Sequence, residues 1–154
     1  MKVFYSWQSD LETLSHRSLI RSALEKALAI VAQELDLEEA ERPQMDEATK
    51  GEAGIVDIAA TILRKIGECS AFVADVTPVC EAPNGKRLPN ANVLFELGFA
   101  YAKPGQTAII AVMNCEKHDP DHLPFDLRGK RIMTYEVADD ASKEVRASVA
   151  KTLS

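Results

Sequence analysis

The stretch that decides the fold is Pro89-Asn90-Ala91-Asn92-Val93-Leu94-Phe95-Glu96-Leu97-Gly98-Phe99-Ala100-Tyr101-Ala102. Glu96 is its one acidic or basic side chain, and burying a carboxylate costs several kcal/mol unless it is paired or protonated. The Pro-Asn-x-Asn opening predicts a helix start, where either Asn can accept a hydrogen bond from a free first-turn N–H. Glu96 would then lie about one turn into the helix, near the positive end of its dipole. Two interpretations stay open: an amphipathic helix with a solvated Glu, or a poised carboxylate at the mouth of a parallel sheet.

Strand and helix patterns alternate along the rest of the chain. Apolar residues at three- and four-residue steps predict helices from Ser9 or Asp10 to Leu35, over 55–66 and over 140–153, besides the helix of Glu96. Alternation of this kind predicts an α/β fold, a flavodoxin-like three-layer sandwich whose five-stranded parallel sheet has the order 2-1-3-4-5. The predicted strands are 3–7, 42–46, 70–76, 107–113 and 131–137.

In this strand order, ligands bind beyond the carboxyl ends of the first and third strands. Ser6 and Trp7 end the first strand, Asp75 and Thr77 end the third, and the Glu96 helix begins at the same edge. The topology therefore predicts one crevice that gathers these residues. Trp7 offers a flat surface on which an aromatic ring can stack.

Composition limits the class of protein. The 154 residues suit a single domain, 1–154, and the abrupt end in a helix suggests a piece cut from a longer protein. A net charge of −6 argues against nonspecific nucleic-acid binding. No apolar run approaches the ~20 residues that cross a bilayer, and no signal peptide is evident. The three cysteines, at wide spacings, suggest free thiols, so we expect a cytoplasmic protein without membrane or nucleic-acid partners.

Two further motifs do not predict a site. Cys115-x-x-His118-x-x-x-His122 is a weak match to zinc-binding patterns, so no metal site is predicted. Asp75 could accept a phosphate at a strand end, but the acidic pair and the Lys that this chemistry needs with Mg²⁺ are missing from the other strand ends.

The pieces 3–10, 72–78, 89–100 and 123–128 together resemble a bacterial TIR-like domain of the kind found in anti-phage defence proteins. The resemblance implies an NAD glycohydrolase or cyclase that cleaves the nicotinamide–ribose bond, with NAD as substrate and no cofactor. It implies Glu96 as the catalytic residue and a homo-oligomer built through TIR–TIR contacts. We expect Ser6, Trp7, Asp46, Asp75 and Asn92 to bind the substrate, although the loop after Asp46 lacks the family's usual Arg.

Cleavage of such a bond passes through an oxocarbenium-like centre, which a single carboxylate can stabilise. Two alternatives remain. The runs 73–75 and 96–102 are also similar to nucleoside 2-deoxyribosyltransferases, in which the matching Glu is a nucleophile. An inert TIR module that only self-assembles is the other alternative, and loss of the Glu would mark it, whereas Glu96 is present.

Overall fold

The sheet of the protein is parallel and five-stranded. A computed structural model describes residues 1–47, 57–103 and 108–154. The strands lie in the order β2-β1-β3-β6-β7, and each neighbouring pair is parallel. A separate antiparallel hairpin, β4-β5, lies outside this sheet, so the predicted order 2-1-3-4-5 is confirmed. The strands of the sheet are β1 Lys2–Ser6, β2 Gln44–Asp46, β3 Ala71–Asp75, β6 Ala108–Asn114 and β7 Ile132–Tyr135.

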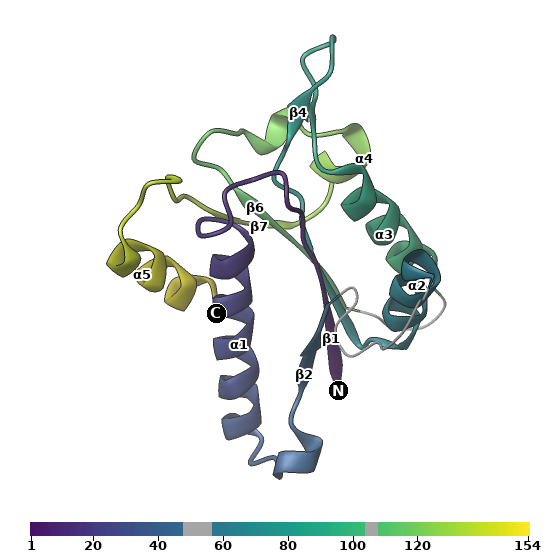
Figure 1. The fold of residues 1–154 in the computed structure, drawn as a ribbon, viewed down its shortest axis with the longest axis vertical. Helices are drawn as coiled ribbons and strands as arrows, with labels where there is room; N and C mark the ends of the chain where they lie inside the picture. The colour runs from purple at the N-terminus through teal and green to yellow at the C-terminus, as the bar shows by residue number, and fades with distance from the viewer. Residues whose placement is uncertain (48–56, 104–107) are drawn as a thin grey trace.

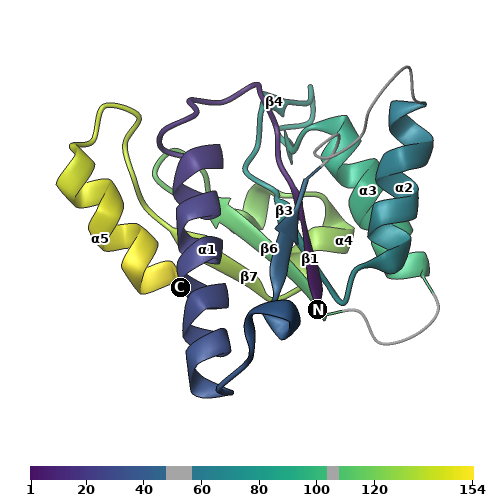
Figure 2. The same ribbon diagram turned by 60° about the horizontal axis from the view of Figure 1, so that its bottom comes forward.

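Helices cover both faces of the sheet, as Figures 1 and 2 show. One face packs against α1 and α5 through a core that includes Tyr5, Ile20 and Val73. The other packs against the remaining α-helices through a core that includes Phe4, Phe72 and Leu97. This three-layer arrangement is the predicted flavodoxin-like α/β sandwich. The α-helices are α1 Arg17–Glu34, α2 Ile58–Glu68, α3 Ala91–Ala102, α4 Phe125–Arg128 and α5 Lys143–Leu153, and two short 3₁₀ turns are Glu39–Glu41 and Pro120–His122.

The first helix begins later than the sequence predicts. Neither Ser9 nor Asp10 caps it, and α1 starts after His16. Leu14 is 49% exposed and lies before the helix, five residues from the buried Leu19. That spacing does not fit a helical face. His16, which lies inside the predicted helix, is instead the residue before α1 and is buried beside Ser15.

Other differences lie in the connections. The connection 77–89, between the predicted strand 70–76 and the helix of Glu96, contains the hairpin of β4 Cys80–Glu81 and β5 Arg87–Leu88, which turns at Gly85 with a φ of +78°. The loop 114–129 contains α4 and a 3₁₀ turn. Two places lie outside the described residues. One is Ile55, where the second helix is predicted to begin, and the other is Pro104-Gly105, where the sequence predicts that the helix of Glu96 stops. Among the helices described, none is long and apolar enough to cross a membrane.

Candidate functional site

Glu96 is held at the carboxyl end of β1 by a short hydrogen bond. The hydroxyl of Ser6, the last residue of β1, donates to Oε2 of Glu96 at 2.5 Å. Ser6 is 2% exposed, and the Glu96 side chain approaches it from the middle of α3. The hydrogen bond therefore links Glu96, the catalytic candidate on α3, to Ser6 at the end of β1, 90 residues away in sequence.

The start of α3 is fixed by a second set of hydrogen bonds. The side chain of Asn90 accepts from the backbone N–H of Asn92 at 2.8 Å and of Val93 at 3.4 Å, so Asn90 is the N-cap. The Asn90 amide donates in turn to the carboxylate of Asp10, in the loop after β1. This chain of bonds sets where α3 begins and hence where Glu96 projects.

Burial raises the pKa of the Glu96 carboxyl above its usual range, and the hydrogen bond from Ser6 opposes that shift. Glu96 is the sixth residue of α3, which begins at Ala91. A helix dipole acts mainly within the first turn, so it does little to favour the ionised form here. The result is a carboxyl group that takes up a proton more readily than an exposed Glu.

A pocket of about 180 Å³ opens beside this pair. It lies at the carboxyl end of β1 and is closed by α3 and α2. It brings together four of the residues that the sequence singled out: Ser6, Trp7, Asn92 and Glu96. The full lining is Phe4, Tyr5, Ser6, Trp7, Gln8, Ser9, Ile62, Asn90, Asn92 and Glu96.

Trp7 is half-buried and presents one face to a cation. The Arg17 guanidinium, at the start of α1, lies 3.4 Å from the centroid of the Trp7 ring. Arg17 is also ion-paired with Glu47 at 3.3 Å. The stack holds the indole in place, and stacking of a substrate ring on Trp7 stays a prediction.

Asp75 lies away from the pocket, on the other side of the sheet. Val73, two residues earlier on β3, packs in the α1 face, and side chains two apart in a strand share a face. Asp75 is 1% exposed, and its Oδ1 accepts from the backbone N–H of Thr77 at 3.0 Å. Burial raises the pKa of its carboxyl, while the bonds from Thr77 oppose the shift. Contact between Asp75 and a substrate stays a prediction.

Asp46 is likewise outside the pocket lining. Its carboxylate forms an ion pair of 2.8 Å with Lys65, a residue of α2 that is 6% exposed. The pair joins the end of β2 to α2. A substrate-binding role for Asp46 stays a prediction, and the residues 48–56 that follow it in sequence lie outside the described part of the chain.

Sequence reasoning missed Gln8, Ser9 and Ile62 as lining residues. Gln8 is 4% exposed, and its amide donates to the carbonyl of Thr77 at 2.9 Å. Its Oε1 is buried and has no hydrogen-bond partner among the described residues. A polar residue directly after a buried strand was the signal that could have pointed to Gln8.

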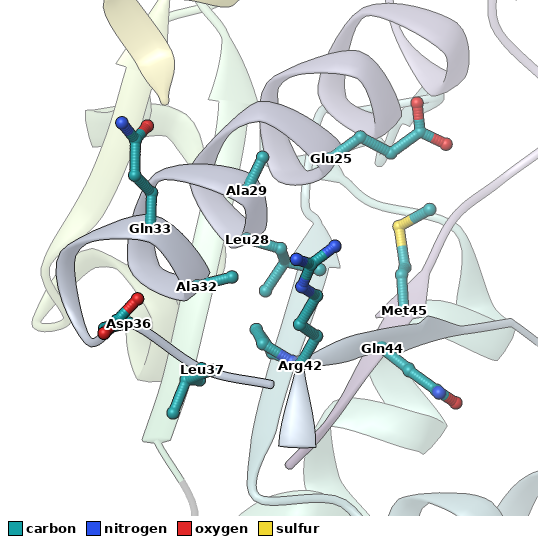
Figure 3. Close-up of a pocket in the computed structure, with 11 residues that line it drawn as sticks. Glu25, Leu28, Ala29, Ala32, Gln33, Asp36, Leu37, Arg42, Gln44 and Met45 are labelled. Atoms are coloured by element: carbon teal, nitrogen blue, oxygen red, sulfur yellow. The ribbon is translucent and has the colours of Figure 1, made fainter. Parts of the chain in front are cut away.

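A larger groove than the Glu96 pocket lies elsewhere among the described residues. A groove of about 720 Å³ runs between the C-terminal half of α1 and the edge strand β2. Figure 3 shows Leu28, Ala29 and Ala32 on its helix side, with Arg42 and Met45 opposite. This groove is at the amino edge of the sheet, so it lacks the strand-end chemistry that the Glu96 pocket has.

Over the ranges 1–47, 57–103 and 108–154, no three His, Cys, Asp or Glu side chains are placed to hold an ion, and this includes Cys115, His118 and His122.

Comparisons with known proteins place the chain in no family. No protein-family model matches it, and no curated protein matches it. Among solved structures it is similar to a "2-desoxiribosyltransferase from Leishmania mexicana", with 18% identity, a TM-score of 0.48, and coverage of 96% of this chain and 94% of that one. The expected membership of the TIR-like family is therefore corrected, because no protein-family model, that of the TIR-like family included, matches the chain.

Proposed function

We propose that the protein cleaves the N-glycosidic bond of a nucleoside, with Glu96 as the catalytic carboxylate. The observation that carries the proposal is the Glu96 side chain itself. It is partly buried at the carboxyl end of a parallel sheet, accepts a hydrogen bond of 2.5 Å from Ser6, and lines a pocket of about 180 Å³. Among the described residues that line this pocket with it, none is Lys or Arg.

A carboxylate in this setting suits a reaction that develops positive charge on a sugar. When the bond from C1′ to the base nitrogen breaks, its electron pair leaves with the base, and C1′ becomes oxocarbenium-like. A fixed negative charge beside C1′ stabilises that state more than the neutral substrate. Ser6 supports the ionised form by donating to Oε2 of Glu96, which leaves Oε1 to approach the sugar.

The proposed sequence of events has two halves. In the first, an oxygen of Glu96 bonds to C1′ as the bond from C1′ to the base nitrogen breaks, and the base leaves with the electron pair and takes a proton from water. In the second, water or another base attacks C1′ and gives up a proton to the solvent, the ester bond to Glu96 breaks, and the carboxylate is restored. The similarity of residues 96–102 to nucleoside 2-deoxyribosyltransferases supports the nucleophilic role.

The charge of the pocket favours a substrate without phosphate. Phosphate groups are held by Lys, Arg or the free N–H groups of a helix start. The described lining has no cation, and the first N–H groups of α3 already donate to Asn90. The carboxylate of Asp10 lies at the same helix start, bound to Asn90. A phosphate placed there would meet negative charge, so we expect a neutral nucleoside.

The test is a chromatographic assay of purified protein with four mixtures. These are a 2′-deoxynucleoside alone, the same with a second free base, its 5′-monophosphate, and NAD. We expect release of free base from the deoxynucleoside, or a new nucleoside when the second base is present, and far less turnover of the two phosphorylated compounds. Failure to cleave any nucleoside, or faster cleavage of NAD or the monophosphate, would contradict the proposal.

Two matched variants show whether the release of free base comes from the Glu96 pocket. Glu96→Gln should abolish most of the release. Glu34→Gln makes the same chemical change at an exposed position at the end of α1, and it should leave the rate unchanged. A rate that is the same in both variants points to a contaminating enzyme and counts against the proposal.

A further inference from the structure

Gln8 is a buried polar residue in the wall of the Glu96 pocket. It comes two residues after Ser6, the last residue of β1, and it is one of the residues that line the pocket. It is 4% exposed. Buried polar side-chain atoms are normally hydrogen-bonded, so one that has no partner beside a ligand pocket calls for an explanation.

The amide nitrogen of Gln8 is already engaged inside the protein. Nε2 donates to the backbone carbonyl of Thr77 at 2.9 Å. Burial raises the pKa of the Asp75 carboxyl, and hydrogen bonds from Thr77 and Gln8 oppose this shift. Carbonyl and carboxylate oxygens accept hydrogen bonds, so both contacts need an N–H group of the Gln8 amide. The donors of the amide are therefore used, and its orientation is fixed.

The amide oxygen of Gln8 is left as a free acceptor. Oε1 is buried and has no hydrogen-bond partner within residues 1–47, 57–103 and 108–154. Turning the amide over does not remove the problem, because Oε1 would then face the Thr77 carbonyl, which is also an acceptor. An acceptor that is buried without a partner costs free energy, which a donor on a bound ligand recovers.

We propose that Gln8 selects the base of the nucleoside by accepting a hydrogen bond at Oε1 from an exocyclic amino group. The substrates are then nucleosides of amino-bearing bases, such as adenine or cytosine. This inference rests on the proposed function, because it takes the ligand of the Glu96 pocket to be a nucleoside. Gln8 is a specificity-determining residue in this scheme and takes no part in the bond cleavage.

The burial of Oε1 decides between two kinds of donor on a base. An exocyclic amino group stands out from the ring, so it reaches an acceptor that is recessed in the wall. The ring N–H of hypoxanthine, uracil or thymine lies beside a carbonyl oxygen, which would meet Oε1 with no donor between them. The Gln8 N–H groups that could bind such a carbonyl are turned toward Thr77. A keto base therefore leaves buried acceptors unpaired, which disfavours its binding.

The test compares three purine 2′-deoxynucleosides that differ at position 6 of the ring. 2′-Deoxyadenosine carries an amino group there, purine 2′-deoxyriboside a hydrogen, and 2′-deoxyinosine a carbonyl oxygen. Binding is measured by equilibrium dialysis with Glu96→Gln, which keeps the nucleoside intact, and kcat/KM is measured with wild type. We expect 2′-deoxyadenosine to exceed purine 2′-deoxyriboside by about fivefold to a hundredfold in both measurements, and 2′-deoxyinosine to be the poorest.

Two matched variants assign this preference to Gln8, each made in both proteins. Gln8→Leu keeps a side chain of similar size and removes both amide atoms, so 2′-deoxyadenosine should lose its advantage over purine 2′-deoxyriboside. Gln33→Leu makes the same change at an exposed position on α1 and should keep the wild-type order. The preference is a ratio within one protein sample, so a smaller folded fraction does not change it. If Gln8→Leu does not fold, the three nucleosides on wild type and Glu96→Gln still decide.

The outcomes separate this inference from the proposed function. Binding that favours 2′-deoxyadenosine without cleavage of any nucleoside would support the role of Gln8 and contradict the proposed function. Cleavage of all three nucleosides with equal kcat/KM would support the function and overturn the role of Gln8. Equal binding of the three, or tighter binding of 2′-deoxyinosine, would also overturn it. So would a preference that survives Gln8→Leu or that Gln33→Leu abolishes equally.

Discussion

The Asn90 side chain caps α3 and so sets where Glu96 projects, and Asn90→Ala tests this role. The substitution removes the acceptor for the N–H groups of Asn92 and Val93. Loss of an N-cap side chain costs about 1 kcal/mol, with a range of about 0.5–2. The bond to Asp10 lies at the surface, where it contributes at most about 1 kcal/mol. Together these losses predict a decrease of about 1.5–2 kcal/mol in the free energy of unfolding.

The measurement is urea-induced unfolding followed by circular dichroism, with thermal melts alongside. For a chain of this size, 1 kcal/mol corresponds to a shift of about 2–4 °C in Tm, so Asn90→Ala should lower Tm by about 3–8 °C. The dependence on urea should keep its slope, because the folded state is unchanged.

Two variants isolate the cap. Asn90→Ser keeps a capping oxygen and should recover most of the stability. Asn92→Ala changes the neighbouring exposed Asn, whose contribution to the cap is its backbone N–H, and it should be neutral or slightly stabilising. If Asn90→Ala were as stable as wild type, or no worse than Asn90→Ser, the cap would not fix the start of α3.

Two further predictions concern the buried carboxyls. Ser6→Ala removes the hydrogen-bond donor that opposes the raised pKa of Glu96. The acid limb of the pH–rate profile should therefore move to higher pH, and the rate near neutral pH should fall by about tenfold or more. An acid limb at the same pH in wild type and Ser6→Ala would contradict this. Burial raises the folded-state pKa of Asp75 above its unfolded value, so the stability it contributes is present at low pH and is lost as pH rises through the folded pKa. Asp75→Asn should therefore gain stability relative to wild type as pH rises above the usual pKa range of an Asp carboxyl in denaturation curves, and a difference that does not change with pH would refute the assignment.

The sheet could be predicted because its signals are local. Strand patterns, the alternation with helices and the handedness of parallel connections leave few strand orders, and the order 2-1-3-4-5 is the one that forms. The N-cap at Asn90 was equally readable, because a side-chain acceptor before an apolar run needs no tertiary context.

The site could be predicted only in part, because the register between two strands is not a local property of the sequence. Ser6 pairs with Ala74 across β1 and β3, which puts Asp75 on the face of Tyr5 and away from Ser6. A sequence shows that both residues end strands, but it does not show which face each one takes. The late start of α1 has a similar origin, since Ser15 and His16 form buried hydrogen bonds before the helix begins.

The direction in which the pKa of Glu96 shifts could not be predicted from the sequence alone. The apolar neighbours of Glu96 and the helix dipole pull its pKa in opposite directions, so composition alone did not decide the outcome. The first residue of α3 is Ala91, which puts Glu96 beyond the first turn, and burial then dominates.

The central claim, that Glu96 is the catalytic carboxylate, is tested most directly by the turnover of a deoxynucleoside by wild type and Glu96→Gln, with melting curves of both. Gln keeps the shape of the side chain and removes its charge, so the variant should fold and should melt at or above the wild-type temperature. Loss of a preorganised charge costs about 3–4 kcal/mol in the transition state, which predicts a rate lower by roughly a hundred- to a thousandfold with little change in KM. A folded Glu96→Gln protein that cleaves the nucleoside at close to the wild-type rate would contradict the account.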